Sequence, residues 1–180
     1  SQRKTIERKL RHLAYHDKLT GLGNRDLFNE DMSALLRNLD RDGSWRGAVL
    51  FLDLDGFKHV NDTLGHDAGD ELLRQAARRL GGLAGPGDIV ARLGGDEFVI
   101  CQQAVRSRVD AERFGRHLVA RMAAPFHVGG HDIALSVSVG TALACIETEA
   151  TPGSRPRSAA DAYSIPAAEV LMKRADMALY

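Results

Sequence analysis

Two pairs of carboxylates stand at positions where acidic residues are uncommon. Asp53 and Asp55 end the otherwise apolar run AVLFLDLD, and Asp96 and Glu97 follow two glycines in RLGGDEF. Strands are poor in acidic residues, and two carboxylates about 4 Å apart repel each other by about 4 kcal/mol at an effective dielectric near 20. A divalent cation reverses this repulsion, because Mg²⁺ prefers carboxylate oxygens together with water and phosphate. The pattern therefore indicates a magnesium–nucleotide site.

Simpler explanations for these acids exist. Asp55 directly precedes an expected helical turn at 57–62, and we expect it to cap that turn. The two acids after the glycines are also ordinary solvated turn residues. Gly94 and Gly95 argue against that second explanation, because paired glycines allow positive φ and a close approach of the backbone to a ligand. Both glycines are therefore included among the expected substrate-binding residues.

Further polar residues lie between the two acidic groups. Phe57 and Lys58 follow the strand end, where backbone N–H groups can hold phosphate oxygens and Lys58 adds a positive charge. Asn61 comes next, and Asp70 opens the following expected helix. A carboxylate accepts from N1–H and N2–H₂ of guanine together, while an amide reads the remaining edge, so this pair selects guanine over adenine. Alternatively, Asn61 is a turn residue and Asp70 an acid at a helix N-terminus.

The elements that must position these residues alternate between helical and strand patterns. The expected order is a helix after a polar break (17–25), a strand (48–55), a helical turn with a loop (56–69), a helix (70–80), two strands (89–93, 98–103) around the turn 94–97, a helix (109–124), a second hairpin through Gly129 and Gly130 into 133–144, a loop (147–166) and a closing helix (166–180). Two hairpins among interleaved helices predict an α/β (α+β) fold with a mixed or mostly antiparallel sheet, not a doubly wound parallel one.

The first sixteen residues form a separate charged segment. Its apolar residues Ile6, Leu10 and Leu13 are spaced four and three apart, which predicts a helix with a narrow apolar stripe. Such a stripe fits either a coiled coil with a second chain or a helix that packs on its own domain. We therefore divide the chain into an N-terminal linker helix (1–16) and one domain (17–180).

Composition narrows the class of protein further. The 180 residues are 44% hydrophobic, with 24 basic and 24 acidic residues, and this neutral balance argues against nucleic acid as a partner. Cys101 and Cys145 lie in apolar stretches without metal-type spacing, as buried thiols of a reducing compartment do. Neither a signal peptide nor a membrane-length apolar run is found, so we expect a cytoplasmic chain without direct membrane contact. A longer parent protein is compatible with a membrane anchor.

Taken together, these stretches resemble the GGDEF family of diguanylate cyclases. The resemblance rests on five blocks in family order, DKLTGLGNR (17–25), FLDLDGFKHVNDTLGHDAGDELL (51–73), RLGGDEF (92–98), SVSVG (136–140) and RADMALY (174–180). It covers the chain from about residue 17 to its end. It implies a nucleotidyl-cyclase-like fold, with a five-stranded central sheet wrapped by helices and the signature on a β-hairpin. It also implies condensation of two GTP into cyclic di-GMP and two pyrophosphates.

The resemblance further implies a metal and catalytic role for particular residues. Asp53 and Asp96 would hold Mg²⁺, or Mn²⁺ in its place, with help from the backbone carbonyl of Leu54. Asp96, Glu97 and Lys58 would form the catalytic group, with Glu97 assisting metal binding or deprotonation. The group that removes the 3′-hydroxyl proton is not identified.

Substrate and partners follow from the same resemblance. The Phe57 backbone and Lys58 would hold the phosphates of GTP, while Asn61 and Asp70 would bind guanine. Since each domain would hold one GTP, the active species would be a symmetric homodimer. The helix at 1–16 resembles the linker through which an upstream sensor controls that pairing, which favours the coiled-coil alternative.

Three departures from the family pattern affect these expectations. Gly85 replaces the arginine of the product-inhibition motif, R-x-x-D, which leaves feedback control in doubt. The chain stops at Tyr180, before the lysine and arginine that usually grip the triphosphate, so we expect weak GTP binding if that end is real. The loop at 147–166 is longer than typical. The alternative function is a non-catalytic module that senses GTP or cyclic di-GMP and regulates an attached domain, for example a phosphodiesterase.

Overall fold

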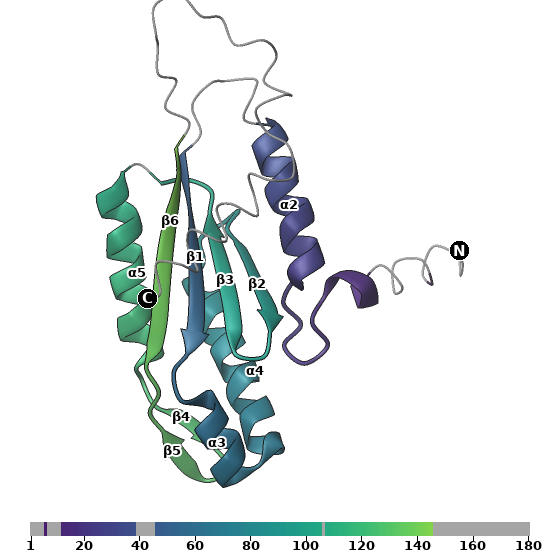
Figure 1. The fold of residues 1–180 in the computed structure, drawn as a ribbon, viewed down its shortest axis with the longest axis vertical. Coiled ribbons are helices and arrows are strands. Elements are labelled where there is room, and N and C mark those ends of the chain that lie inside the picture. Colours follow the sequence, from purple (N-terminus) through teal and green to yellow (C-terminus); the bar gives the residue numbers. More distant parts are fainter. Residues whose placement is uncertain (1–5, 7–11, 39–45, 106, 146–180) are drawn as a thin grey trace, which may run out of the picture.

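The computed structural model describes residues 6, 12–38, 46–105 and 107–145. Their centre is an antiparallel sheet with strand order β2-β3-β1-β6, shown in Figure 1. Its strands are β1 (Arg46–Leu54), β2 (Ile89–Gly94), β3 (Glu97–Gln102) and β6 (Val137–Cys145). The remaining elements are α2 (Arg25–Asn38), α3 (Phe57–Leu64), α4 (His66–Leu83), α5 (Arg108–Met122), β4 (Phe126–Val128) and β5 (His131–Ile133).

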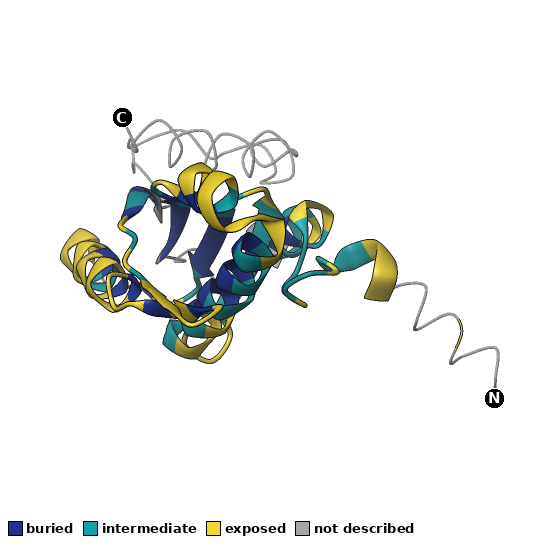
Figure 2. Cartoon of the chain, turned by 90° about the horizontal axis from the view of Figure 1, so that it is seen from below, coloured by how far each residue is buried: buried dark blue, intermediate teal, exposed yellow. Residues whose placement is uncertain are grey.

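Strand β1 shows why the sheet carries helices on both faces. Its side chains alternate between the faces, as they do in any strand, and both sets are buried. Leu50 and Leu52 belong to a cluster with residues of α3, α4 and α5, whereas Phe51 packs with residues of α2. In Figure 2 the buried residues accordingly lie between the sheet and the helices, whose outer faces are exposed. A strand that is apolar on both faces therefore holds the centre of the sheet.

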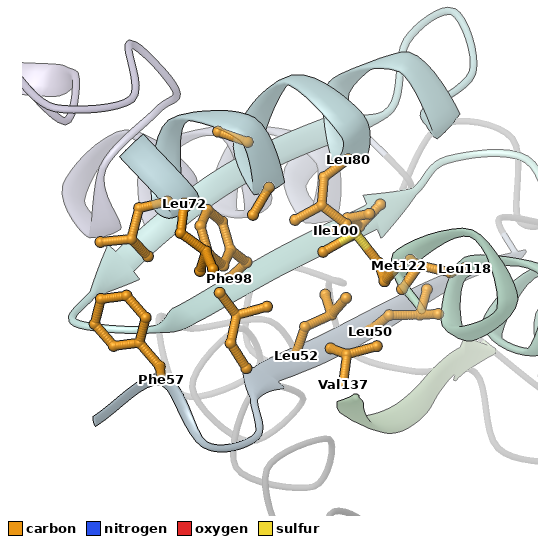
Figure 3. Packing of buried hydrophobic residues seen from close by; sticks show 14 of the residues in the cluster. Leu50, Leu52, Phe57, Leu72, Leu80, Phe98, Ile100, Leu118, Met122 and Val137 are labelled. Atoms are coloured by element: carbon orange, nitrogen blue, oxygen red, sulfur yellow. The ribbon is translucent and has the colours of Figure 1, made fainter. Parts of the chain in front are cut away.

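The larger core cluster lies under α4 and α5. Figure 3 shows Leu50 and Leu52 of β1 facing Leu80 of α4 and Leu118 of α5 across this cluster. Phe57, the first residue of α3, is also part of it, with 9% of its surface exposed. The start of α3, immediately beyond the end of β1, is therefore anchored in the core.

The fold class predicted from the sequence is confirmed, with corrections in detail. The hairpin that carries the signature is present as β2 and β3. The expected count of five strands is not met among the described residues, where the central sheet has four. Its named strand pairs are all antiparallel.

Two boundaries in the middle of the chain also differ. Helix α4 begins at His66, before the predicted start at residue 70, because Gly65 (φ 87°) makes the turn out of α3. The second hairpin is limited to the short strands β4 and β5, and β6 leaves it to pair with β1.

The ends of the chain are only partly described. Ile6 and residues 12–15 are helical, and Ile6 and Leu13 are 58% and 56% exposed, so these two side chains do not pack on the domain. The predicted loop at 147–166 and helix at 166–180 lie outside the described residues. In the part that the structure does describe, no helix has the length and apolar character needed to cross a membrane.

Arg79 of α4 closes the C-terminal end of α5. Its guanidinium donates hydrogen bonds to the carbonyls of Arg121, Met122, Ala124 and Pro125 at 2.5–3.3 Å. It also lies 3.9 Å from the centre of the Phe126 ring. The last carbonyls of a helix have no partner within the helix, so this one side chain satisfies two of them, binds two more in the segment that follows, and fixes α5 against α4.

We predict that Arg79→Ala lowers the free energy of unfolding by about 2 kcal/mol, because it leaves several carbonyls unpaired and removes the contact with Phe126. Urea unfolding followed by circular dichroism measures this change. Arg78→Ala is the matched control, since its salt bridge to Glu71 is exposed and should contribute at most about 0.5 kcal/mol. Equal losses in the two variants would contradict the role given to Arg79.

Candidate active site

The acidic residues singled out in the sequence meet at one end of the sheet. The antiparallel register places Asp53 of β1 directly opposite Glu97 of β3. The backbone N–H of Leu54 donates to the carbonyl of Asp96 at 3.4 Å, which holds the hairpin tip beside the end of β1. Residues 53 and 96, forty-three positions apart in sequence, are thus neighbours in the fold.

The electrostatics of this end of the sheet centre on Asp53. Burial first, and then the nearby carboxylates of Asp96, Glu97 and Asp55, together raise the pKa of Asp53 to about 6. Asp96 lies within hydrogen-bonding reach of the Asp53 carboxyl. The Oδ1 atom of Asp53 is buried and has no hydrogen-bond partner. A buried carboxylate oxygen facing other carboxylates is the environment that a divalent cation stabilises.

The acids do not make a complete metal site by themselves. Within the described residues, no group of three or more His, Cys, Asp or Glu side chains is arranged to hold a metal ion. The donor set of Asp53 and Asp96 nevertheless fits a hard cation that takes its remaining ligands from water and phosphate. The Leu54 carbonyl is the third expected ligand. The fit is therefore to a cation that arrives with a phosphate-bearing ligand.

The glycine turn brings Asp96 to this position. Gly94 pairs with Glu97, so Gly95 and Asp96 form a two-residue turn, and the φ angles of Gly94 and Gly95 are 142° and 53°. L-residues with side chains rarely adopt such angles, which explains the two glycines structurally. Whether the turn also approaches a ligand, as expected from the sequence, stays a prediction.

Arg92 and Asp17 form an ion pair that holds the signature turn in place, and sequence reasoning missed it. Nε and Nη2 of Arg92 donate to the carbonyl of Gly95 at 3.0 and 2.7 Å, and Nη1 donates to both carboxylate oxygens of Asp17 at 2.9 and 3.0 Å. Thr20 donates to Asp17 through its N–H and its hydroxyl. Burial alone would raise the pKa of Asp17, but the hydrogen bonds from Thr20 and Arg92 outweigh it and lower the pKa.

The segment before α2 therefore contacts the active-site turn. The sequence signal was the polar block DKLTGLGNR, which we interpreted as a break and as one block of the family resemblance, without expecting this contact. Its last residue, Arg25, also reaches Glu97, with Nη2 3.6 Å from Oε2. Both side chains of this pair are about half exposed, so the contact contributes little stability. Its effect is to place a positive charge beside the second acid of the signature.

The helix-capping role expected for Asp55 is wrong. The cap position of α3 is Gly56 (φ 81°), with no side-chain cap. The Asp55 carboxylate instead accepts hydrogen bonds from the hydroxyls of Ser136 and Ser138 at 2.7 and 2.8 Å. The two hydroxyls that bind this carboxylate are far from it in sequence. Asp55 therefore links the β1–α3 junction to β6.

The expected phosphate-binding residues begin α3. His59 and Val60 donate to the Gly56 carbonyl, so the N–H groups of Phe57 and Lys58 lie in the first turn, where amides have no acceptor within the helix. The Phe57 ring is buried in the core, and Lys58 is exposed. A buried ring fixes the start of the helix, while two amides and an exposed ammonium remain available to an anion at its N-terminus.

The two expected guanine-binding residues lie on neighbouring helices. Asn61 is on α3 and Asp70 on α4, and both are partly exposed. No hydrogen bond joins either side chain to another residue in the part of the chain that the structure describes. Asp70 is the fifth residue of α4, not the first, so it is not an acid at the helix N-terminus. Both side chains are thus available to a ligand.

Asp88, the acid of the expected product-inhibition motif, has a structural role. Its carboxylate accepts from the N–H of Gly85 at 2.8 Å and from the N–H of Gln103 at 3.1 Å. These bonds close the loop before β2.

An α/β domain with carboxylates at a strand end, helix amides beside them and two unpaired polar side chains nearby has the features of a metal-dependent nucleotide-binding domain. Comparison with known proteins makes this class more specific. Residues 14–180 match the family "Diguanylate cyclase, GGDEF domain". The chain belongs to this family.

Curated relatives include proteins of different named activities. The chain is 44% identical over 136 residues to the bifunctional diguanylate cyclase/cyclic di-GMP phosphodiesterase MucR of Pseudomonas aeruginosa, covering 76% of this chain and 20% of the relative. It is 42% identical over 135 residues to the diguanylate cyclase TpbB of the same species, covering 74% and 31%. The chain thus spans less than a third of the length of these relatives.

Solved structures agree with the fold. The GGDEF domain of TpbB from Pseudomonas aeruginosa superposes with a TM-score of 0.74 at 38% identity, covering 92% of this chain and 86% of the other. The coiled coil and GGDEF domain of DgcB from Caulobacter crescentus, solved with c-di-GMP, gives a TM-score of 0.78 at 27% identity, covering 99% and 85%. The nucleotidyl-cyclase-like expectation is confirmed at the level of fold.

The raised pKa of Asp53 makes a prediction about stability. The pKa of Asp53 is about 6 in the folded state and near 3.8 in the unfolded state. The carboxyl therefore lowers the free energy of unfolding as pH rises between those two values. Asp53→Asn cannot ionise, so without divalent cations it should be more stable than the wild type by about 1 kcal/mol at pH 7, and this advantage should vanish near pH 4.

Urea unfolding in EDTA at the two pH values measures the difference. Asp67→Asn, an exposed acid in the first turn of α4, is the control and should show no such gain at pH 7. A wild type that is as stable as Asp53→Asn at pH 7 would show that the carboxylates do not repel one another.

Proposed function

We propose that this domain is a diguanylate cyclase, which condenses two GTP into cyclic di-GMP and two pyrophosphates with Mg²⁺. The observation that carries the proposal is the convergence of Asp53 and Asp96, with one carboxylate oxygen of Asp53 buried and unpartnered. Family membership supports it, since relatives include named diguanylate cyclases.

Each group of residues has a distinct part in the proposed reaction. Asp53, Asp96 and the Leu54 carbonyl would hold the cation, which when bound neutralises phosphate charge. The first-turn amides of α3 and Lys58 would hold the triphosphate, and Asn61 and Asp70 would read guanine. Gly94 and Gly95 would let the backbone approach the substrate. Mn²⁺ satisfies the same ligand set.

The bond changes are those of a phosphoryl transfer. The 3′-oxygen of one GTP forms a bond to the α-phosphorus of the other as the bond to pyrophosphate breaks, and the hydroxyl proton is released. Repeating the step in the opposite direction closes the ring. The protein accelerates this mainly by holding the reactants in line and stabilising charge. Lys58 would offset negative charge on the phosphates, and Glu97 would assist metal binding or deprotonation.

Ring closure requires two domains that face each other, so we propose a symmetric homodimer. Ile6 and Leu13 support the linker-helix proposal for residues 1–16, because they are seven residues apart and exposed in the single chain. Side chains at one heptad position are buried only against a second helix. The DgcB structure comprises a coiled coil and a GGDEF domain, and the match covers 85% of it, which is consistent with this arrangement. A sensor upstream of the helix and a cytoplasmic location stay predictions.

A second candidate function is favoured by one relative. The chain is 40% identical over 134 residues to a Pseudomonas aeruginosa protein, NbdA, that is named a cyclic di-GMP phosphodiesterase. A domain of this family that binds GTP or cyclic di-GMP without turnover, and regulates an attached domain, fits the same site residues. The two functions differ in product formation.

We predict that Asp96→Ala abolishes turnover and changes folding little, because a turn acid contributes little to the core. Incubation of the full-length protein with GTP and Mg²⁺, with detection of pyrophosphate and cyclic dinucleotide, measures this. Asp62→Ala, an exposed acid on α3, should retain activity. Wild-type binding of GTP without product would support the sensor function, and absence of nucleotide binding would reject both.

Asp70→Asn should weaken GTP binding about 10- to 100-fold, because two charge-assisted hydrogen bonds to the base are lost. Affinity for ATP, which never made these bonds, should change much less. Isothermal titration calorimetry with both nucleotides in the presence of Mg²⁺ tests the assignment. Unchanged affinity for GTP would refute it.

A further inference from the structure

Gly69 lies where α4 crosses α3, and it is buried. A Cβ atom at this position would be 1.9 Å from Oδ1 and 2.9 Å from Cγ of Asn61, and 3.3 Å from Cζ of Phe57. Carbon atoms of a real side chain do not approach an oxygen so closely. The end of the Asn61 side chain therefore occupies the space that any other residue at position 69 would fill.

The backbone gives no reason for glycine at this position. Gly69 is in the helix interior with ordinary helical geometry, where glycine is less favourable than alanine. Gly81 and Gly82 of the same helix have no neighbouring atoms within 4 Å of an added Cβ. The close neighbour at position 69 is the Asn61 amide, so the local steric need comes from that side chain.

The space beside Gly69 that the end of the Asn61 side chain occupies, called the notch below, adjoins the proposed base-binding pair Asn61 and Asp70. Asp70 is the next residue of α4, so the Asn61 amide lies against α4 beside the residue that carries the carboxylate. The ring of Phe57 also borders this space, with Cζ 3.3 Å from the added Cβ, and Figure 3 shows this ring in the core cluster. Gly69 thus lies among three residues to which the proposed function gives contacts with GTP.

We propose that Gly69 is a positioning residue for guanine recognition. By lacking a side chain, it lets the Asn61 amide lie beside Asp70, so that both polar groups can address one base. The inference rests on the proposed function and adds to it a residue that would not itself contact the nucleotide. Exclusion of a side chain at position 69 sets the orientation of Asn61, and with it part of the selectivity for guanine.

Gly69→Ala tests this directly. The added methyl group displaces the end of a partly exposed, rotatable side chain, so the chain should fold, while the Asn61 amide turns away from Asp70. We expect GTP affinity to fall about five- to tenfold, the loss expected for one neutral hydrogen bond and the same as for Asn61→Ala. Affinity for ATP should stay near that of the wild type, because the phosphate-binding residues are unchanged.

Matched variants separate positioning from general damage. Gly81→Ala makes the same chemical change on the same helix in open space, and should leave the GTP-to-ATP affinity ratio unchanged. The double variant Gly69→Ala/Asn61→Ala should bind GTP no more weakly than Asn61→Ala, because Gly69 acts through Asn61. Additive losses would overturn the inference.

Asn61→Gln gives an independent test that leaves α4 intact. It keeps the amide but places it one methylene farther from the α3 backbone and so away from its position beside Asp70, and GTP affinity should fall as in Asn61→Ala. Retention of wild-type GTP affinity by Gly69→Ala or Asn61→Gln, while Asn61→Ala loses it, would overturn the inference and leave the proposed function standing. If the wild type fails to bind GTP, or Asn61→Ala binds it normally, the proposed site itself fails.

Discussion

The register of β1 between β3 and β6 is the constraint on which the rest of the site depends. This register sets Asp53 opposite Glu97 and leaves Asp55 within reach of Ser138 of β6 and of Ser136 just before it. Like charges directly opposite each other weaken a sheet, yet here they stand at the end of its central strand. The buried apolar side chains of β1 on both faces hold the pairing against this repulsion. The fold thus maintains a destabilised acidic cluster that a cation would relieve.

Other parts of the molecule limit movement around that cluster. Arg92 joins the carbonyl of Gly95 to the carboxylate of Asp17, so the signature turn is tied to the segment that precedes α2. Asp55 ties the start of α3 to β6 in the same manner. Both acids have satisfied hydrogen bonds, in contrast to Asp53, whose Oδ1 has none. Asp17 and Asp55 thus stabilise the segments around the site, whereas Asp53 is left unsatisfied. This distribution is expected where stability is given up for binding.

The helix pair α3–α4 provides a second, separate part of the site. Its position is set by the core, through Phe57 and the buried face of α4, while its polar residues remain open to a ligand. The metal binding proposed at the strand end and the base recognition proposed between the helices would therefore depend on different contacts. Relatives in this family include cyclases, a bifunctional enzyme and a phosphodiesterase, which is consistent with one domain serving in several longer proteins.

The sequence alone determined the fold class, the signature hairpin and the residues of the acidic cluster, because strand periodicity, paired glycines and misplaced carboxylates are local signals. It could not determine the role of Asp55, because an acid just before a helix fits two roles. Whether it caps that helix or accepts hydrogen bonds from Ser136 and Ser138 depends on where β6 lies. Tertiary structure likewise decided the Asp17–Arg92 pair and the notch at Gly69. Each is a contact between segments whose separation in the chain carries no pattern, so only packing of the whole domain brings them together.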